Sequence, residues 1–203
     1  MNTSADYAPG AVPDPIESLA LRLRMQYREQ ITGELVLPAR PGRYAPFPGA
    51  LDTQLVHALK QRGVERLYCH QAASWDSIQA GQHTVVVTPT ASGKTLSYNL
   101  PVLQAALQRK AKALYMFPTK ALAQDQVAEL IALNQAGELG VRAFTFDGDT
   151  PGDARKAVRT RGDIVVTNPD MLHQGILPHH TKWAQFFESL EYVVIDELHS
   201  YRG

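Results

Sequence analysis

Five short runs of mostly apolar residues recur from residue 84 onward, and amphipathic stretches separate them. The runs are Thr84–Val87, Ala113–Phe117, Val141–Phe146, Asp163–Thr167 and Tyr192–Ile195. Each run is continuously apolar instead of alternating with polar residues, which is typical of parallel strands that are covered on both faces. Strands that alternate with helical stretches in this way predict an α/β domain, with a mostly parallel sheet between helices.

The first 50 residues have a different texture, because seven of the 13 prolines fall there. Prolines at this density interrupt long helices and inner strands. We therefore expect an extension over residues 1–50 and the α/β domain over residues 51–203. One helix is predicted inside the extension, from Pro15 to Gln30, with Asp14 as its cap and an apolar face that includes Ile16 and Leu19.

The stretch T-P-T-A-S-G-K-T, from Thr88 to Thr95, lies between the first apolar run and a helical stripe of leucines. A phosphate chain binds where backbone N–H groups point inward at a helix N-terminus, with a lysine and a hydroxyl for the phosphate oxygens and Mg²⁺. The residues that would supply this loop are Thr90, Ala91, Ser92, Gly93, Lys94 and Thr95. Because Thr88 stands where the general pattern has glycine, a chance Gly-Lys-Thr at an ordinary helix start is the alternative.

The last apolar run ends in two adjacent carboxylates, Asp196 and Glu197. Ligands of open α/β sheets sit at the carboxyl ends of strands, so we expect these acids to face the phosphate loop. Asp196, with the Thr95 hydroxyl, would hold Mg²⁺, and Glu197 would orient and deprotonate the water that attacks the γ-phosphate. The alternative is that both acids only cap the next helix.

Composition narrows the partners of the chain. Lys and Arg together number 20, as do Asp and Glu, so the long-range field that draws a basic protein to nucleic acid is absent and any such contact must be local. No segment approaches the ~20 apolar residues of a membrane span, and residues 1–10 have no leader pattern. The single cysteine, Cys69, cannot form an internal disulfide. We expect a cytoplasmic location and no membrane partner.

From about His70 onward the chain resembles the first RecA-like domain of a superfamily 2 helicase of the DEAD/DEAH-box kind, with the second motif spelled D-E-L-H at Asp196 to His199. The surrounding spellings resemble the large bacterial mitomycin-repair DNA helicases. This resemblance implies ATP-dependent unwinding and translocation from 3′ to 5′, with ATP and Mg²⁺ as cofactors and DNA more than RNA as the partner. It also implies that Gln71 reads the adenine edge, with a surface glutamine at a helix start as the alternative. His199 would couple nucleotide state to nucleic-acid binding.

Three segments resemble the family's contacts to the sugar-phosphate backbone. The segment F-P-T-K-A-L-A-Q is similar to motif Ia and contains Pro118, Thr119 and Lys120. The segment V-T-N-P-D is similar to motif Ib and contains Thr167, Asn168 and Pro169. The segment F-D-G-D-T-P, with Gly148, resembles the glycine-containing loop between these motifs. The first two segments follow expected strands where helices begin, so free N–H groups and hydroxyls can meet phosphates without reading bases. Ordinary strand-to-helix turns, and a tight turn at Gly148, are the alternatives.

The D-E-L-H motif lies close to Gly203, so the resemblance implies that the Ser-Ala-Thr motif, the second RecA-like domain and its arginine finger are not encoded in residues 1–203. An arginine finger contributes roughly 10³ to 10⁵ in turnover, so we expect these residues alone to hydrolyse ATP very slowly. The family also places a further strand between the phosphate-loop strand and the Asp-Glu strand. We therefore expect a domain that is incomplete at its C-terminus, with a gap or a rearranged pairing in the sheet.

Two other functions fit the same residues. One is a non-catalytic module that binds ATP or single-stranded nucleic acid, which multiple-turnover phosphate release stimulated by nucleic acid would exclude. The other is a small-molecule P-loop kinase. The adjacent acids disfavour the kinase, because they suit the activation of water and the sequence shows no acceptor pocket or mobile lid.

Overall fold

The computed structural model describes residues 14–35, 41–89 and 92–201, and the chain divides into two compact units at Pro41 and Gly42. In the first unit, helix α1 (Pro15–Gln26) begins at Asp14, whose carboxylate accepts a hydrogen bond from the Ile16 N–H at 2.9 Å. The helix ends four residues earlier than predicted, because Tyr27 leaves helical backbone angles and residues 27–30 form a turn. No residue of α1 is buried.

The second unit is built on a four-stranded parallel sheet in the order β4-β5-β3-β6. Its strands are β3 (Lys112–Met116), β4 (Ala143–Thr145), β5 (Ile164–Thr167) and β6 (Leu190–Ile195). A small antiparallel pair is formed by β1 (Tyr44–Ala45) and β2 (Leu67–Tyr68). Four of the five predicted strands and the parallel α/β class are thereby confirmed.

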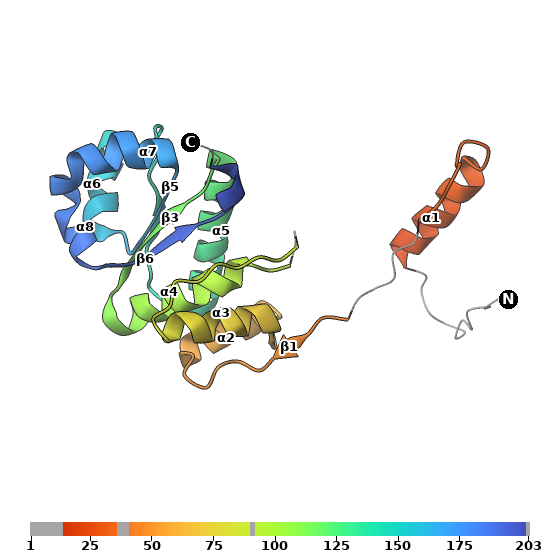
Figure 1. The fold of residues 1–203 in the computed structure, drawn as a ribbon, viewed down its shortest axis with the longest axis horizontal. Coiled ribbons are helices and arrows are strands. Elements are labelled where there is room, and N and C mark those ends of the chain that lie inside the picture. Colours follow the sequence, from red (N-terminus) through yellow and green to blue (C-terminus); the bar gives the residue numbers. More distant parts are fainter. Residues whose placement is uncertain (1–13, 36–40, 90–91, 202–203) are drawn as a thin grey trace. The chain divides into compact units, whose positions relative to one another are not determined.

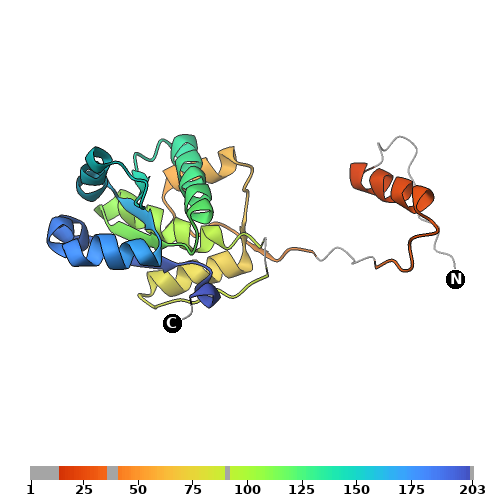
Figure 2. The same cartoon turned by 90° about the horizontal axis from the view of Figure 1, so that it is seen from above.

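Helices cover both faces of this sheet (Figure 1). One group contains α2 (Thr53–Gln61), α3 (Cys69–Gln79), α4 (Thr95–Arg109) and α5 (Lys120–Gly137). The other contains α6 (Gly152–Arg161), α7 (Pro169–Met171), the π-helical turn η1 (Leu172–Ile176), the 3-10 segment η2 (Leu177–Trp183) and α8 (Ala184–Glu188). A last short turn, η3 (Leu198–Ser200), follows β6. Figure 2 shows α5 beside α2, against which it packs.

Continuous apolar runs suit this sandwich because successive side chains of a strand point to opposite faces. On β3 and β5, Tyr115 and Val166 join the core formed with α2 to α5. Their neighbours Leu114 and Val165 join the core formed with α6, η1, η2 and α8. Both strands are therefore buried on both sides, as their composition predicted.

The prediction of a strand at Thr84–Val87 is wrong for this structure. These residues are extended but pair with no strand among the described residues, and the side chains of Val85 and Val87 are 77% and 89% exposed. The physical reason is the lack of a neighbour, because a strand needs a partner for its backbone N–H and C=O groups.

The expected gap in the sheet lies at the same place. Strand β6 pairs with β3 on one side only, and within the described part of the chain no strand covers its other side. Burial alternates along β6, so that Val193 and Ile195 are 55% and 44% exposed. The resemblance implied either a gap or a rearranged pairing here. Among the described residues, β6 has an open side with apolar side chains and does not pair with residues 84–87.

Candidate nucleotide and nucleic-acid site

The phosphate loop leads directly into α4. Its first and fifth residues are linked, because the Thr88 and Ser92 hydroxyls are 2.6 Å apart, and the Lys94 ammonium donates to the Thr88 carbonyl at 3.4 Å. Gly93 has a φ of +76°, a backbone angle that side chains disfavour, which is why glycine stands here. Thr95 is the first residue of the helix. Thr90 and Ala91 lie outside the described residues.

Gln71 holds this loop from the adjacent helix. It is 3% exposed, its amide group donates to the Gly93 carbonyl at 2.7 Å, and its amide oxygen accepts from the Tyr68 N–H at 2.8 Å. The NH2 group therefore fastens α3 to the phosphate loop, while the amide oxygen caps the start of α3 itself. Adenine recognition by Gln71 stays a prediction.

The two acids follow β6 at its carboxyl end. The Asp196 N–H continues the ladder by donating to the Met116 carbonyl at 3.1 Å, and one Asp196 carboxylate oxygen accepts from the Glu197 N–H at 2.9 Å. Glu197 has a φ of +49°, in the left-handed region, which costs a residue other than glycine roughly 1–2 kcal/mol. Its carboxylate lies 3.4 Å from Nδ1 of His199, a largely exposed side chain.

Tyr98 connects the phosphate-loop helix to the acids. Its hydroxyl lies 3.4 Å from Oδ2 of Asp196 and 3.2 Å from Oε1 of Gln126 on α5. Burial, and then the negative charge of Asp196, hold the pKa of Tyr98 well above its usual value, so the hydroxyl keeps its proton. The start of α4 and the end of β6 therefore meet at one end of the sheet.

Replacing Tyr98 with Phe should weaken Mg²⁺-dependent ATP binding about five- to tenfold while leaving Mg²⁺-free binding nearly unchanged. The ring would still pack edge-on against Tyr115, at 5.6 Å between centroids, but the contact of the hydroxyl with Asp196 would be lost. Titration of a fluorescent ATP analogue with and without Mg²⁺ measures both affinities.

The matched control is Tyr115→Phe. The Tyr115 hydroxyl is buried and donates to Asn99 at 2.9 Å, so its removal should cost stability without changing the Mg²⁺ dependence. Equal Mg²⁺ dependence in wild type and Tyr98→Phe would show that Tyr98 does not position Asp196.

The three segments expected to bind nucleic acid follow β3, β4 and β5. Because these strands and β6 are parallel, their carboxyl ends lie at the same end of the sheet as Asp196. Thr119 caps α5 by accepting from the Leu122 N–H at 3.3 Å, and Asn168 caps α7 by accepting from the Met171 N–H at 2.8 Å. Pro118 directly precedes Thr119, and Pro169 begins α7.

Gly148 lies in a tight turn that its neighbours hold. The Asp147 carboxylate accepts from the Asp149 N–H at 2.9 Å, and the Asp147 N–H donates to the Thr150 hydroxyl at 2.9 Å. Lys120 forms an ion pair with Asp149 at 2.5 Å, which brings this turn beside the start of α5. Asp149 raises the pKa of Lys120, so the amine stays charged.

Thr167 is placed differently from the other residues of its segment. It is 2% exposed, and its hydroxyl donates to the Phe146 carbonyl at 2.8 Å. The side chain therefore joins β5 to the end of β4 inside the fold, and we leave its hydroxyl out of the proposed contact surface.

Sequence reasoning missed several residues of this site. Tyr98 is three residues after Thr95 and thus on the same helix face, a signal that could have been used. Tyr68 stacks on Tyr44 at 5.0 Å between centroids and lies beside Gly93, but the pairing of β1 with β2 that brings Tyr44 there has no local signature. Arg155, which donates to three carbonyls of the turn around Gly148, was also not foreseen.

Comparison with known proteins places this arrangement in a family. The model of the DEAD/DEAH box helicase family matches residues 68–203. The chain belongs to the DEAD/DEAH box helicase family. This match confirms the predicted family. It also argues against the alternative that the chain is a small-molecule P-loop kinase. No helix among the described residues is long and apolar enough to cross a bilayer.

Individual relatives agree with this assignment. The chain is 53% identical over 165 residues to the uncharacterized ATP-dependent helicase YprA of Bacillus subtilis, covering 81% of this chain and 22% of YprA. It is 42% identical over 183 residues to the ATP-dependent helicase hrq1 of Schizosaccharomyces pombe, covering 87% of this chain and 17% of hrq1. The structure of the helicase MrfA bound to DNA and AMPPNP matches with a TM-score of 0.82 and 48% identity, covering 90% of this chain and 26% of MrfA. The chain thus spans about a fifth of the length of its curated relatives.

Proposed function

We propose that this chain is the ATP-binding RecA-like part of an ATP-dependent DNA helicase. The observation that carries the proposal is the contact between the Tyr98 hydroxyl and Asp196, which places the phosphate-loop helix and Asp196 at one end of the sheet. DNA and AMPPNP are bound by MrfA, and DNA and ATP are the ligands that we propose here. Unwinding would further require a second RecA-like domain, and we assign the protein to the cytoplasm.

The residues present fit ATP with Mg²⁺. Bound ATP and Mg²⁺ supply the phosphoryl group and the cation that neutralises its developing charge. Mg²⁺ takes few protein ligands, typically one or two carboxylates besides the substrate phosphates, and the Thr95 hydroxyl and the Asp196 carboxylate are oxygens of this kind. The Tyr98 hydroxyl lies 3.4 Å from Oδ2 of Asp196, and Thr95 lies one turn before Tyr98 on α4, so both oxygens are at the same end of the sheet.

Lys94 and Glu197 would then have separate roles, Lys94 in phosphate binding and Glu197 in the activation of water. Lys94 offers a positive charge to the β and γ oxygens, and the loop of Ser92 and Gly93 offers backbone N–H groups. Glu197 holds a water and accepts its proton. The His199 ring lies 3.4 Å from the Glu197 carboxylate, where it would couple the nucleotide state of the site to the binding of nucleic acid. Gln71 keeps the loop in position for these contacts.

Single-stranded DNA would run along the end of the sheet at which β3, β4 and β5 terminate. Pro118, Thr119 and Lys120 lie at one segment, Gly148 at the next, and Asn168 and Pro169 at the third. A backbone phosphate would compete with Asp149 for the Lys120 ammonium, because both are anions. Exposed ion pairs are weak, so this exchange costs little.

Two measurements test the proposal. The whole chain should bind a fluorescent ATP analogue with Mg²⁺ and, separately, a labelled single-stranded oligonucleotide. The longest soluble form of the protein should release phosphate over many turnovers, faster when DNA is added. Binding of both ligands with no DNA-stimulated release in that longer form would favour a non-catalytic module instead.

A further inference from the structure

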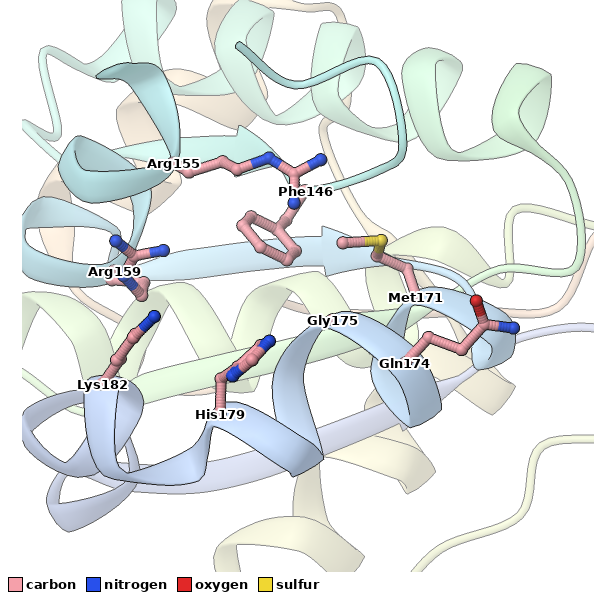
Figure 3. A pocket seen from close by; sticks show the side chains of 8 residues that line it. All are labelled: Phe146, Arg155, Arg159, Met171, Gln174, Gly175, His179 and Lys182. Atoms are coloured by element: carbon pink, nitrogen blue, oxygen red, sulfur yellow. The ribbon is translucent and has the colours of Figure 1, made fainter. Parts of the chain in front are cut away.

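A basic pocket lies on the helical face formed by α6, η1 and η2, away from the phosphate loop. Its volume is about 340 Å³. Arg155 and Arg159 line it from α6, His179 and Lys182 line it from η2, and Phe146 and Met171 give it an apolar floor. Figure 3 shows Lys182 and His179 extending from η2 toward α6, which carries Arg159. Arg155 lies over the Phe146 ring, on its opposite side.

The charge of this pocket is unbalanced. Three of its lining residues are arginine or lysine and none is acidic. Arg155 is occupied, because it donates to the carbonyls of Thr150, Asp147 and Gly148 at 2.9 to 3.3 Å. In the part of the chain that the structure describes, neither Arg159 nor Lys182 has a hydrogen-bond or ion-pair partner. Like charges that share a pocket repel one another, so an anion bound between them would be stabilised.

The pocket adjoins the proposed DNA path. Phe146 of its floor leads into the turn of Gly148, and Asp149 of that turn pairs with Lys120. Met171 is the last residue of α7, the short helix that begins with Pro169. Pocket and path are therefore joined through two of the three proposed contact segments.

We propose that this pocket binds a backbone phosphate of single-stranded nucleic acid, beyond the segments that resemble the family's contacts. A phosphodiester offers several oxygens to an arginine fork and a lysine ammonium at once. The chain has no net charge, so such a local cluster is a means of gaining affinity without a basic surface overall. This inference rests on the proposed function, because it assumes that the neighbouring edge binds the same strand.

The double substitution Arg159→Gln/Lys182→Gln tests the pocket. Against wild type, it should weaken binding of a labelled oligothymidylate about tenfold near 0.1 M salt, and the slope of log affinity against log salt should fall by about 0.7 for one lost phosphate contact. The matched control is Lys156→Gln/Arg161→Gln, which removes the same charge from exposed positions of α6 outside the pocket. It should change affinity less than about twofold. Equal weakening by both pairs would mean a general charge effect and overturn the proposal.

A scan with neutral methylphosphonate linkages locates the contact. A neutral linkage at one position of the oligonucleotide should weaken its binding to wild type but not to the pocket variant. If Arg159 and Lys182 have only a structural role, no position should show this difference. Titration with inorganic phosphate and with AMP forms the second arm. If these bind the pocket while the pocket variant retains full oligonucleotide affinity, the ligand is a free phosphate compound and the proposal is wrong. If the wild-type chain binds no oligonucleotide, the proposed function fails with it.

Discussion

Lys94→Ala should lower the affinity of the chain for ATP with Mg²⁺ by about 100-fold. The ammonium lies within the phosphate loop, where it donates to the Thr88 carbonyl. No other lysine or arginine belongs to the stretch from Thr88 to Thr95, so alanine would leave the phosphate oxygens without their charged partner. A lost charge-assisted hydrogen bond of about 3 kcal/mol corresponds to this factor. Titration of a fluorescent ATP analogue into the whole chain measures it.

The control for this substitution is Lys60→Ala, which removes the same charge from an exposed position on α2. It should leave the affinity for ATP unchanged. Both variants should unfold at the temperature of the wild type, because neither side chain is part of the apolar core. Wild-type affinity in Lys94→Ala would remove the phosphate loop from the proposed site.

Glu197→Gln should keep ATP binding and slow hydrolysis by about 10² to 10⁴, the usual contribution of a positioned general base. Glutamine preserves the shape of the side chain and can still contact a water, but it cannot accept a proton. The left-handed backbone at position 197 is retained, since glutamine and glutamate meet the same steric restriction. Single-turnover hydrolysis in the longest soluble form of the protein is the measurement.

Glu188→Gln is the matched control, because Glu188 is an exposed acid at the end of α8. It should hydrolyse ATP at the wild-type rate. A normal rate in Glu197→Gln would show that the base has been assigned to the wrong residue, while the nucleotide site itself would stand on the Lys94 result.

Local patterns were sufficient where local physics decides the structure. Strands β3 and β5 are buried on both faces, and this is visible as an unbroken apolar run. Asp14 caps α1 as predicted, because its short carboxylate accepts from a backbone N–H of the first turn.

The same patterns failed where a partner from elsewhere in the chain decides. Thr84–Val87 is as apolar as the true strands, yet it pairs with nothing among the described residues. Thr167 was predicted to bind phosphate through its hydroxyl, yet that hydroxyl is buried and donates to the Phe146 carbonyl. Burial and hydrogen bonding of a residue depend on what lies across from it, which spacing along the chain does not encode.

The sequence by itself determined the parallel α/β class and the family, and it supplied the candidate reactive side chains, because strand burial, loop chemistry and adjacent acids all depend on neighbouring residues. Only the tertiary structure decided which of these groups meet. The Tyr98 hydroxyl on α4 meets Asp196 at the end of β6, and Arg159 and Lys182 face one pocket from separate elements. Such contacts join residues far apart in the chain, and they exist only once the helices have packed against the strands.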